Sequence, residues 1–174
     1  HPRLVIPFFD EDNKMFALQG RAFGAEEPKY ITIILNPEKE KIYGLNRVDW
    51  NETVYVVEGP LDSLFLDNCV ATAQSDLRVK GDKNVVLIPD NEPRNKEIVK
   101  QIEKFIDSDY SIVLWPEEVK EKDINEMILS GKTKQDIQEL ISKNTFSGIR
   151  AKTQFIYWKK VDINENRNIS RGKN

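Results

Sequence analysis

The sequence predicts an α/β fold: a mostly parallel β-sheet with helices on both faces, preceded by a small β-rich segment. The 174 residues are enough for one good-sized domain with a smaller appendage. From about residue 51 onward, apolar runs of strand length alternate with runs of helical spacing, a pattern typical of parallel sheets. Before that point the apolar runs are short and are separated by turn residues, as in hairpins.

The β-rich segment has three short stretches rich in Ile, Val, Phe and Tyr, at residues 4–9, 15–23 and 29–35. The polar run at 10–14 separates the first two and has the composition of a turn. We therefore predict a small antiparallel sheet of hairpins within residues 1–50.

Residues 51–145 carry the alternating pattern. Continuous apolar runs predict four strands, at 53–59, 69–73, 84–90 and 110–116. Helical spacing predicts four helices, at 60–68, 95–109, 122–131 and 132–144. The clearest of these is the second, because Ile98, Ile102 and Phe105 recur on one face.

The end of the chain, residues 146–174, is predicted to be a basic strand or tail. The run 152–161 is rich in apolar and aromatic residues and favours a final strand or an amphipathic arm. Residues 141–174 carry eight Lys or Arg and only two acidic residues. Such an excess is typical of a solvated terminus, and the alternative is an arm that contacts phosphates.

Composition excludes several kinds of chemistry. Cys69 is the only cysteine and His1 the only histidine, which rules out a disulfide within the chain, a Cys/His zinc site and a Ser-His-Asp triad built around an internal His. No apolar run approaches the roughly 20 residues of a membrane span, and the N-terminal residues do not resemble a signal peptide. We therefore expect a cytoplasmic protein with no membrane partner.

Acidic residues follow the predicted strands at one end. Glu58 ends the first strand of the parallel sheet, Asp90 and Glu92 follow the third, and Asp123 opens the helix after the fourth. The carboxyl ends of parallel strands meet at the same edge of a sheet, where ligands bind. Several carboxylates crowded at one edge repel one another unless a cation neutralises them. The pattern therefore predicts a site for Mg²⁺ or Mn²⁺, which prefer oxygen ligands.

Each of these acids also has a structural explanation when taken alone. Asp123 has the position of a helix cap, Asp90 that of a turn residue, and Glu58 that of an exposed strand end. The metal-site interpretation rests on their occurring together.

Three short motifs resemble those of the Toprim domain, which is found in bacterial-type primases, topoisomerases and some nucleases. They are VVEGPLD at 56–62, LIPDNE at 87–92 and KDINEM at 122–127. The first 50 residues are similar to DnaG-like primases in particular, in the segments QGRAFG at 19–24, EPKYIT at 27–32 and KIYGLNRV at 41–48. Order and approximate spacing agree over residues 3–130, and the resemblance implies a compact, phage-type primase catalytic core.

The resemblance implies roles for the acids. Asp90 and Glu92 would bind Mg²⁺ or Mn²⁺ carrying the incoming triphosphate, and Asp123 would support a second ion. Glu58 would be a further ligand or a base near the attacking 3′-hydroxyl. These residues form the predicted catalytic and metal site.

The resemblance also implies a nucleotide and nucleic-acid surface. Arg21 and Lys29 would contact nucleotide phosphates or the template backbone, with Lys39 or Lys41 and Arg3 as further candidates. Composition alone favours ordinary surface charge for these side chains.

The chain departs from the family pattern at three places. Glu92 stands where the family has a second Asp, Asn91 where it has Gly, and Asn125 where many members have Asp. We also expect that the family's zinc-binding module is not in this chain and that it either precedes His1 in a longer protein or is absent. A helicase-binding domain is not evident in the sequence.

The function implied is template-directed synthesis of short RNA primers during DNA replication. The partners would be a single-stranded DNA template, ribonucleoside triphosphates and a replicative helicase, in the cytoplasm of a bacterial or phage-infected cell. Two alternatives remain open: a Toprim-type metal-dependent nuclease, and a non-catalytic Toprim module that binds nucleic acid or a partner.

Overall fold

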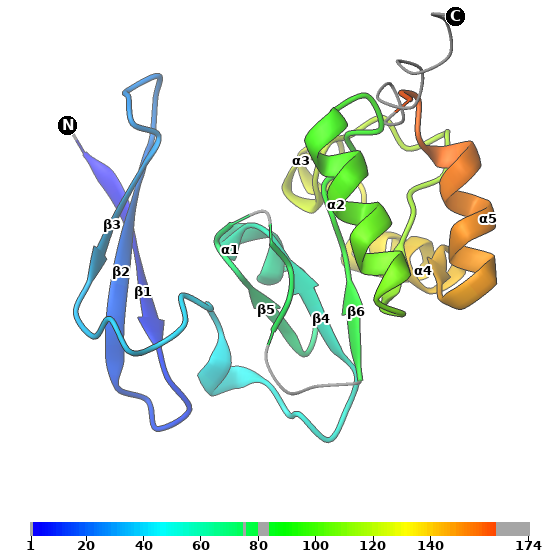
Figure 1. Ribbon diagram of the computed structural model, residues 1–174. Coiled ribbons are helices and arrows are strands. Elements are labelled where there is room, and N and C mark those ends of the chain that lie inside the picture. The colour runs from blue at the N-terminus through cyan, green and yellow to red at the C-terminus, as the bar shows by residue number, and fades with distance from the viewer. Residues whose placement is uncertain (1, 75, 80–83, 163–174) are drawn as a thin grey trace, which may run out of the picture.

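In the computed structural model, the described residues are 2–74, 76–79 and 84–162. Sheet A is antiparallel and has the order β1-β2-β3, formed by β1 (Arg3–Phe9), β2 (Met15–Ala22) and β3 (Tyr30–Ile34). Figure 1 shows these strands in blue, to one side of the rest of the chain. The turn between β1 and β2 forms around Asp10, whose Oδ1 accepts the N–H groups of Asp12 and Lys14 at 3.1 and 2.9 Å.

Sheet B has five strands in the order β5-β4-β6-β7-β8. The parallel strands are β4 (Val54–Val57), β5 (Cys69–Ala71), β6 (Val85–Leu87) and β7 (Ser111–Val113). A short strand that the sequence did not predict, β8 (Thr145–Phe146), pairs antiparallel with β7. The parallel strands are apolar along most of their length because helices cover both of their faces.

The helices lie on both faces of sheet B, as predicted. They are α1 (Pro60–Ser63), α2 (Lys96–Asp107), α3 (Ile124–Leu129), α4 (Lys134–Lys143) and α5 (Gly148–Trp158), with a 3₁₀ turn at Leu45–Arg47. Val56 and Leu87 face a core with α2 and α5, whereas Val57 and Val86 face a core with α3 and α4. The predicted α/β fold is therefore confirmed, and the division into domains stays a prediction.

Two predicted elements were wrong. Residues 152–161 do not form a strand or arm: most of them lie in α5, because Ala151, Phe155 and Trp158 recur at helical spacing and are buried against sheet B. The helix predicted at 60–68 is only the four residues of α1, and Leu64 beyond it is exposed. The part of the predicted basic tail at 163–174 lies outside the described residues. No helix among those that the structure describes is long and apolar enough to cross a membrane.

Sheet A is joined to sheet B through an aromatic contact. Phe8 is fully buried and packs edge-to-face on Phe16 and Tyr43, with ring centroids 6.2 and 5.4 Å apart. Leu61 of α1 and Ala73 pack against the same cluster. This contact fixes sheet A beside the carboxyl ends of β4 and β6.

We expect Phe8→Ala to lower the free energy of unfolding by about 3–5 kcal/mol, because it leaves a cavity where the two sheets meet. The measurement is urea unfolding followed by tryptophan fluorescence. Phe23→Ala is the matched control: Phe23 is 70% exposed, so its loss should change stability by about 0.5 kcal/mol or less. Equal losses in the two variants would contradict this account of the interface.

Candidate metal and nucleotide site

Three of the four predicted acids line one cavity at the edge of sheet B, and the fourth, Glu92, is connected to them through Lys122. β4 and β6 are parallel neighbours, with Val56 opposite Leu87, so the residues that follow them emerge side by side. Glu58, Asp90 and Asp123 line one cavity of about 380 Å³, together with Asp62 from α1. Its other wall comes from the N-terminal segment, through Gln19, Tyr30 and Thr32 of sheet A and through Lys29, which precedes β3.

Burial makes these carboxyl groups hard to ionise. It raises the pKa of Glu58 to about 8, and the nearby charge of Asp90 adds to the effect. Burial likewise raises the pKa of Asp62 to about 7 and that of Asp90 to about 6. A site that crowds partly buried acids in this way gains stability from a bound cation.

Lys122 supplies a positive charge to this cluster. Its Nζ lies 3.3 Å from Oδ2 of Asp90 and 3.4 Å from Oε1 of Glu92, so it bridges two of the predicted ligands. Partial burial lowers the pKa of Lys122, but the charges of Asp90 and Glu92 outweigh this and raise it. Lys122 was not among the site residues predicted from the sequence, although it is the first residue of the KDINEM motif.

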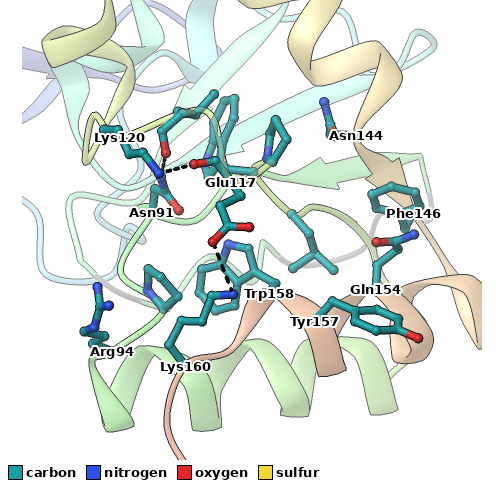
Figure 2. Close-up of a pocket in the computed structure, with 15 residues that line it drawn as sticks. Asn91, Arg94, Glu117, Lys120, Asn144, Phe146, Gln154, Tyr157, Trp158 and Lys160 are labelled. Carbon is teal, nitrogen blue, oxygen red and sulfur yellow. Dashed lines mark hydrogen bonds and ion pairs between the residues drawn. The ribbon is translucent and has the colours of Figure 1, made fainter.

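Hydrogen bonds from Asn91 fix the backbone of the segment that carries Lys122. The Asn91 backbone N–H donates to the Lys122 carbonyl at 2.6 Å, and its Nδ2 donates to the carbonyls of Val119 and Glu121 at 2.9 and 3.2 Å. The loop of residues 116–122 is thereby tied to the turn that carries Asp90 and Glu92. Figure 2 shows Asn91 beside this loop, near Glu117 and Lys120. The Asn91 side chain thus donates two hydrogen bonds to this loop, which a Gly at the same position could not make.

Asp62 and Asp123 organise the start of α3. Oδ1 of Asp123 accepts the N–H of Glu126 at 2.7 Å, so the capping explanation holds for this residue. Oδ1 of Asp62 accepts the backbone N–H of Asn125 at 2.8 Å. Gly59 permits this arrangement, because a Cβ at that position would overlap Oδ2 of Asp62. The sequence signal for Asp62 was its place one turn after Glu58 in the VVEGPLD motif.

The donor set suits a hard divalent cation. It consists of carboxylate oxygens, although within the described ranges no group of three Asp, Glu, His or Cys side chains is placed to hold an ion by itself. Mg²⁺ is usually held by one or two carboxylates, with waters and substrate phosphates completing its shell. The residues present therefore fit such an ion. Cys69, the one thiol, is buried away from solvent, which raises its pKa.

The chain is similar in sequence and in fold to DNA primases. No family model matches the chain. The DNA primase of Enterobacteria phage T4 is 40% identical over 166 residues, which are 92% of this chain and 48% of that protein. The Aquifex aeolicus primase structure, comprising zinc-binding and RNA polymerase domains, aligns with a TM-score of 0.64 at 20% identity, over 91% of this chain and 48% of that one. A DnaG primase catalytic domain bound to single-stranded DNA aligns with a TM-score of 0.66 at 15% identity, over 88% of this chain and 55% of that one.

The chain is therefore similar to DNA primases, and it has the fold of DnaG primase catalytic domains. It spans about half the length of the curated primase that it matches. The structural likenesses are below 25% identity and show the primase fold, with the same combination of a small antiparallel sheet and a mainly parallel one.

Four of the five basic residues predicted to contact nucleotide or nucleic acid fall into two groups within this primase fold. Lys29 and Lys41 line the cavity and face the acids across it. Lys39 instead forms an ion pair of 3.0 Å with the buried Asp10, whose hydrogen bond raises the pKa of Lys39. Arg3 donates to the carbonyls of Gly20, Pro28 and Lys29 at 2.9 to 3.3 Å, which fixes the segment that carries Lys29.

Arg21 belongs to neither group. Its Nε is buried and has no hydrogen-bond partner within the part of the chain that the structure describes. It is paired with Leu4 and Tyr30 across sheet A. Of the five predicted basic contacts, the structure therefore brings Lys29 and Lys41 to the acidic cavity.

We expect Asn91→Ala to lower the free energy of unfolding by about 1–3 kcal/mol, because it leaves the Val119 and Glu121 carbonyls without their donor. Chemical denaturation measures this directly. Asn51→Ala is a control, since the Asn51 side-chain amide donates to the exposed side chain of Asp49 and not to a backbone carbonyl of the described residues. A loss no greater than that of the control would mean that Asn91 does not hold the loop.

The raised pKa values predict how stability depends on pH in the absence of metal. Glu58, Asp62 and Asp90 have folded-state pKa values of about 8, 7 and 6, above the ordinary 4.5 for Glu and 3.8 for Asp. Their contribution to stability is therefore complete below about pH 4 and is lost as the pH rises through about 8. In EDTA, we expect the Tm to fall between about pH 5 and about pH 8.5.

Glu58→Gln should make that fall shallower, because the amide cannot ionise. Glu139→Gln is its control, as Glu139 is an exposed residue of α4 paired with Lys143. A Tm that falls as steeply in Glu58→Gln as in the wild type would show that Glu58 does not titrate in this range.

Proposed function

We propose that this chain is the catalytic core of a DNA primase, which synthesises short RNA primers on single-stranded DNA by metal-dependent nucleotidyl transfer during DNA replication. The observation that carries the proposal is the cavity that partly buried carboxylates at the edge of sheet B share with Lys29 and Lys41 of the N-terminal segment. The 40% identity to a phage DNA primase over most of the chain supports it.

The acids have the roles of positioning and proton transfer in this proposal. Asp90 and Glu92 hold Mg²⁺ or Mn²⁺, with Glu58 beside them and Asp123 available for a second ion. A bound divalent ion supplies positive charge that offsets the negative charge of the phosphoryl group. The raised pKa of Glu58 also suits it to accept the proton of a 3′-hydroxyl.

The basic side chains bind the anionic substrates. Lys29 and Lys41 reach the cavity and contact the triphosphate or the template backbone. Single-stranded DNA is the proposed template, in line with the DNA-bound DnaG domain of the same fold. Ribonucleoside triphosphates and a replicative helicase are the other proposed partners, in the cytoplasm of a bacterial or phage-infected cell.

The decisive experiment is primer synthesis on single-stranded DNA with ribonucleotides and Mg²⁺ or Mn²⁺. We expect Asp90→Asn to reduce synthesis at least about 100-fold, because it removes a charged ligand from the phosphoryl-transfer site. The readout is the yield of labelled ribo-oligomers on a denaturing gel. Asp107→Asn is the control and should retain full synthesis. Asp107 is exposed at the end of α2 and forms an ion pair with Lys152 of α5, and neither residue lines the acidic cavity.

The alternative functions give different results in the same assay. Template degradation that depends on Asp90, without synthesis, would indicate a Toprim nuclease. Nucleic-acid binding that is unchanged by Asp90→Asn, with neither reaction, would indicate a non-catalytic module. Because the chain spans about half of its curated relative, the assay is run on the chain and on a protein extended to the relative's full length.

A further inference from the structure

Lys122 occupies the position between the two carboxylates that the proposed function assigns to a divalent ion. Its Nζ is 3.3 Å from Asp90 and 3.4 Å from Glu92. Its neighbours in the cavity wall are acidic: Asp123 is adjacent in the chain, and Glu58 and Asp62 lie close enough to Asp90 for each to feel its charge. An ammonium group here screens a cluster that is otherwise negative.

A divalent ion on Asp90 and Glu92 would compete with Lys122 for the same oxygen atoms. Two cations that share the same carboxylates repel each other, so both cannot keep their best positions. The backbone of Lys122 is not free to retreat, because Asn91 holds its carbonyl and those of Val119 and Glu121. The side chain is 47% exposed, and it is therefore the part that can move.

The direction in which Lys122 can move is set by the cavity. Its side chain lines the same space as Lys29 and Lys41, which lie on the wall contributed by the N-terminal segment. A triphosphate placed between these walls would meet lysine side chains on both sides. Lysine binds phosphate as a mobile point charge and so can exchange one anionic partner for another.

We propose that Lys122 is an internal cation that occupies the metal site of the free protein and transfers to the nucleotide phosphates when a divalent ion binds. Lys122 thereby lowers the affinity of the free protein for a bare ion and raises its affinity for an ion that arrives with a triphosphate. This inference rests on the proposed function, and it adds a positioning residue that selects the metal–nucleotide complex over the metal alone.

The test compares Mn²⁺ binding with and without nucleotide in Lys122→Met, which keeps most of the side-chain length and removes the charge. We expect the Kd for Mn²⁺ alone, measured by electron paramagnetic resonance, to fall about fivefold, the effect of removing one partly exposed charge. The Kd for ATP in saturating Mn²⁺, measured by calorimetry, should rise about fivefold for the same reason. Without metal, the Tm of the variant should be below that of the wild type, and Mn²⁺ should raise it by more.

Lys120→Met is the matched control, because Lys120 is in the same loop and its Nζ donates to the Glu117 carbonyl rather than to the acids. It should leave both affinities unchanged. Tighter Mn²⁺ binding is a gain that simple loss of structure cannot produce, so it distinguishes a competing cation from a purely structural ion pair. Lys122→Arg should stay close to the wild type for Mn²⁺ alone.

Three results would overturn the inference. If Lys122→Met binds Mn²⁺ no more tightly than the wild type does, Lys122 does not compete with the ion. If Mn²⁺ binding tightens but ATP binding does not weaken, the transfer to phosphate is wrong. In both cases an Asp90-dependent primer synthesis would leave the proposed function standing. If neither protein binds Mn²⁺, the proposed metal site fails along with the inference.

Discussion

The partial burial of several carboxyl groups at one edge of sheet B, with the repulsion between them, is the constraint on which the rest of the site depends. Glu58 and Asp90 arrive there because β4 and β6 are parallel neighbours, a pairing that an antiparallel hairpin cannot give. Their partial burial is what would favour a bound cation at this edge, since exposed acids would be screened by water. Burying charged carboxyl groups costs free energy. The bridging position of Lys122 and the hydrogen bond from the Asn125 N–H to Asp62 both offset part of that cost.

Sheet A turns that edge from a surface into a cavity. One of its faces supplies Ile6 and Phe8 to the cluster that packs on Tyr43, and the same face carries Gln19, Tyr30 and Thr32 to the cavity. The bond from Gln19 Nε2 to Thr32 Oγ1, 3.2 Å long, holds two of these side chains together across β2 and β3. The apolar contact around Phe8 and the polar cavity wall are thus two parts of one β-sheet face. Packing of Phe8 against Tyr43 therefore also fixes the position of the cavity wall.

The ends of the strands and the acids that follow them could be predicted from the sequence, because both depend on the local pattern of apolar and acidic residues. Apolar runs gave β4 and β6, and parallel topology then brought Glu58 and Asp90 together. Lys122 was missed because its position depends on hydrogen bonds from Asn91 to residues about 30 positions away, which no local pattern encodes. Helix α5 was missed for a related reason: its Phe, Ile, Tyr and Trp favour strands locally, and burial of Phe155 and Trp158 decides otherwise.

Two departures from the family pattern, Asn125 and Glu92, still make contacts that organise the site. Asn125 replaces an acid, yet Asp62 binds its backbone N–H, a contact that any residue except proline provides. Glu92 is one methylene longer than Asp, and its two oxygens have separate partners: Oε1 faces Lys122 at 3.4 Å, and Oε2 accepts from Nδ2 of Asn95 at 3.2 Å. Asn95 is also the N-cap of α2. The longer side chain therefore connects the acidic turn to a helix that packs on the sheet, and this anchoring holds Glu92 beside Asp90.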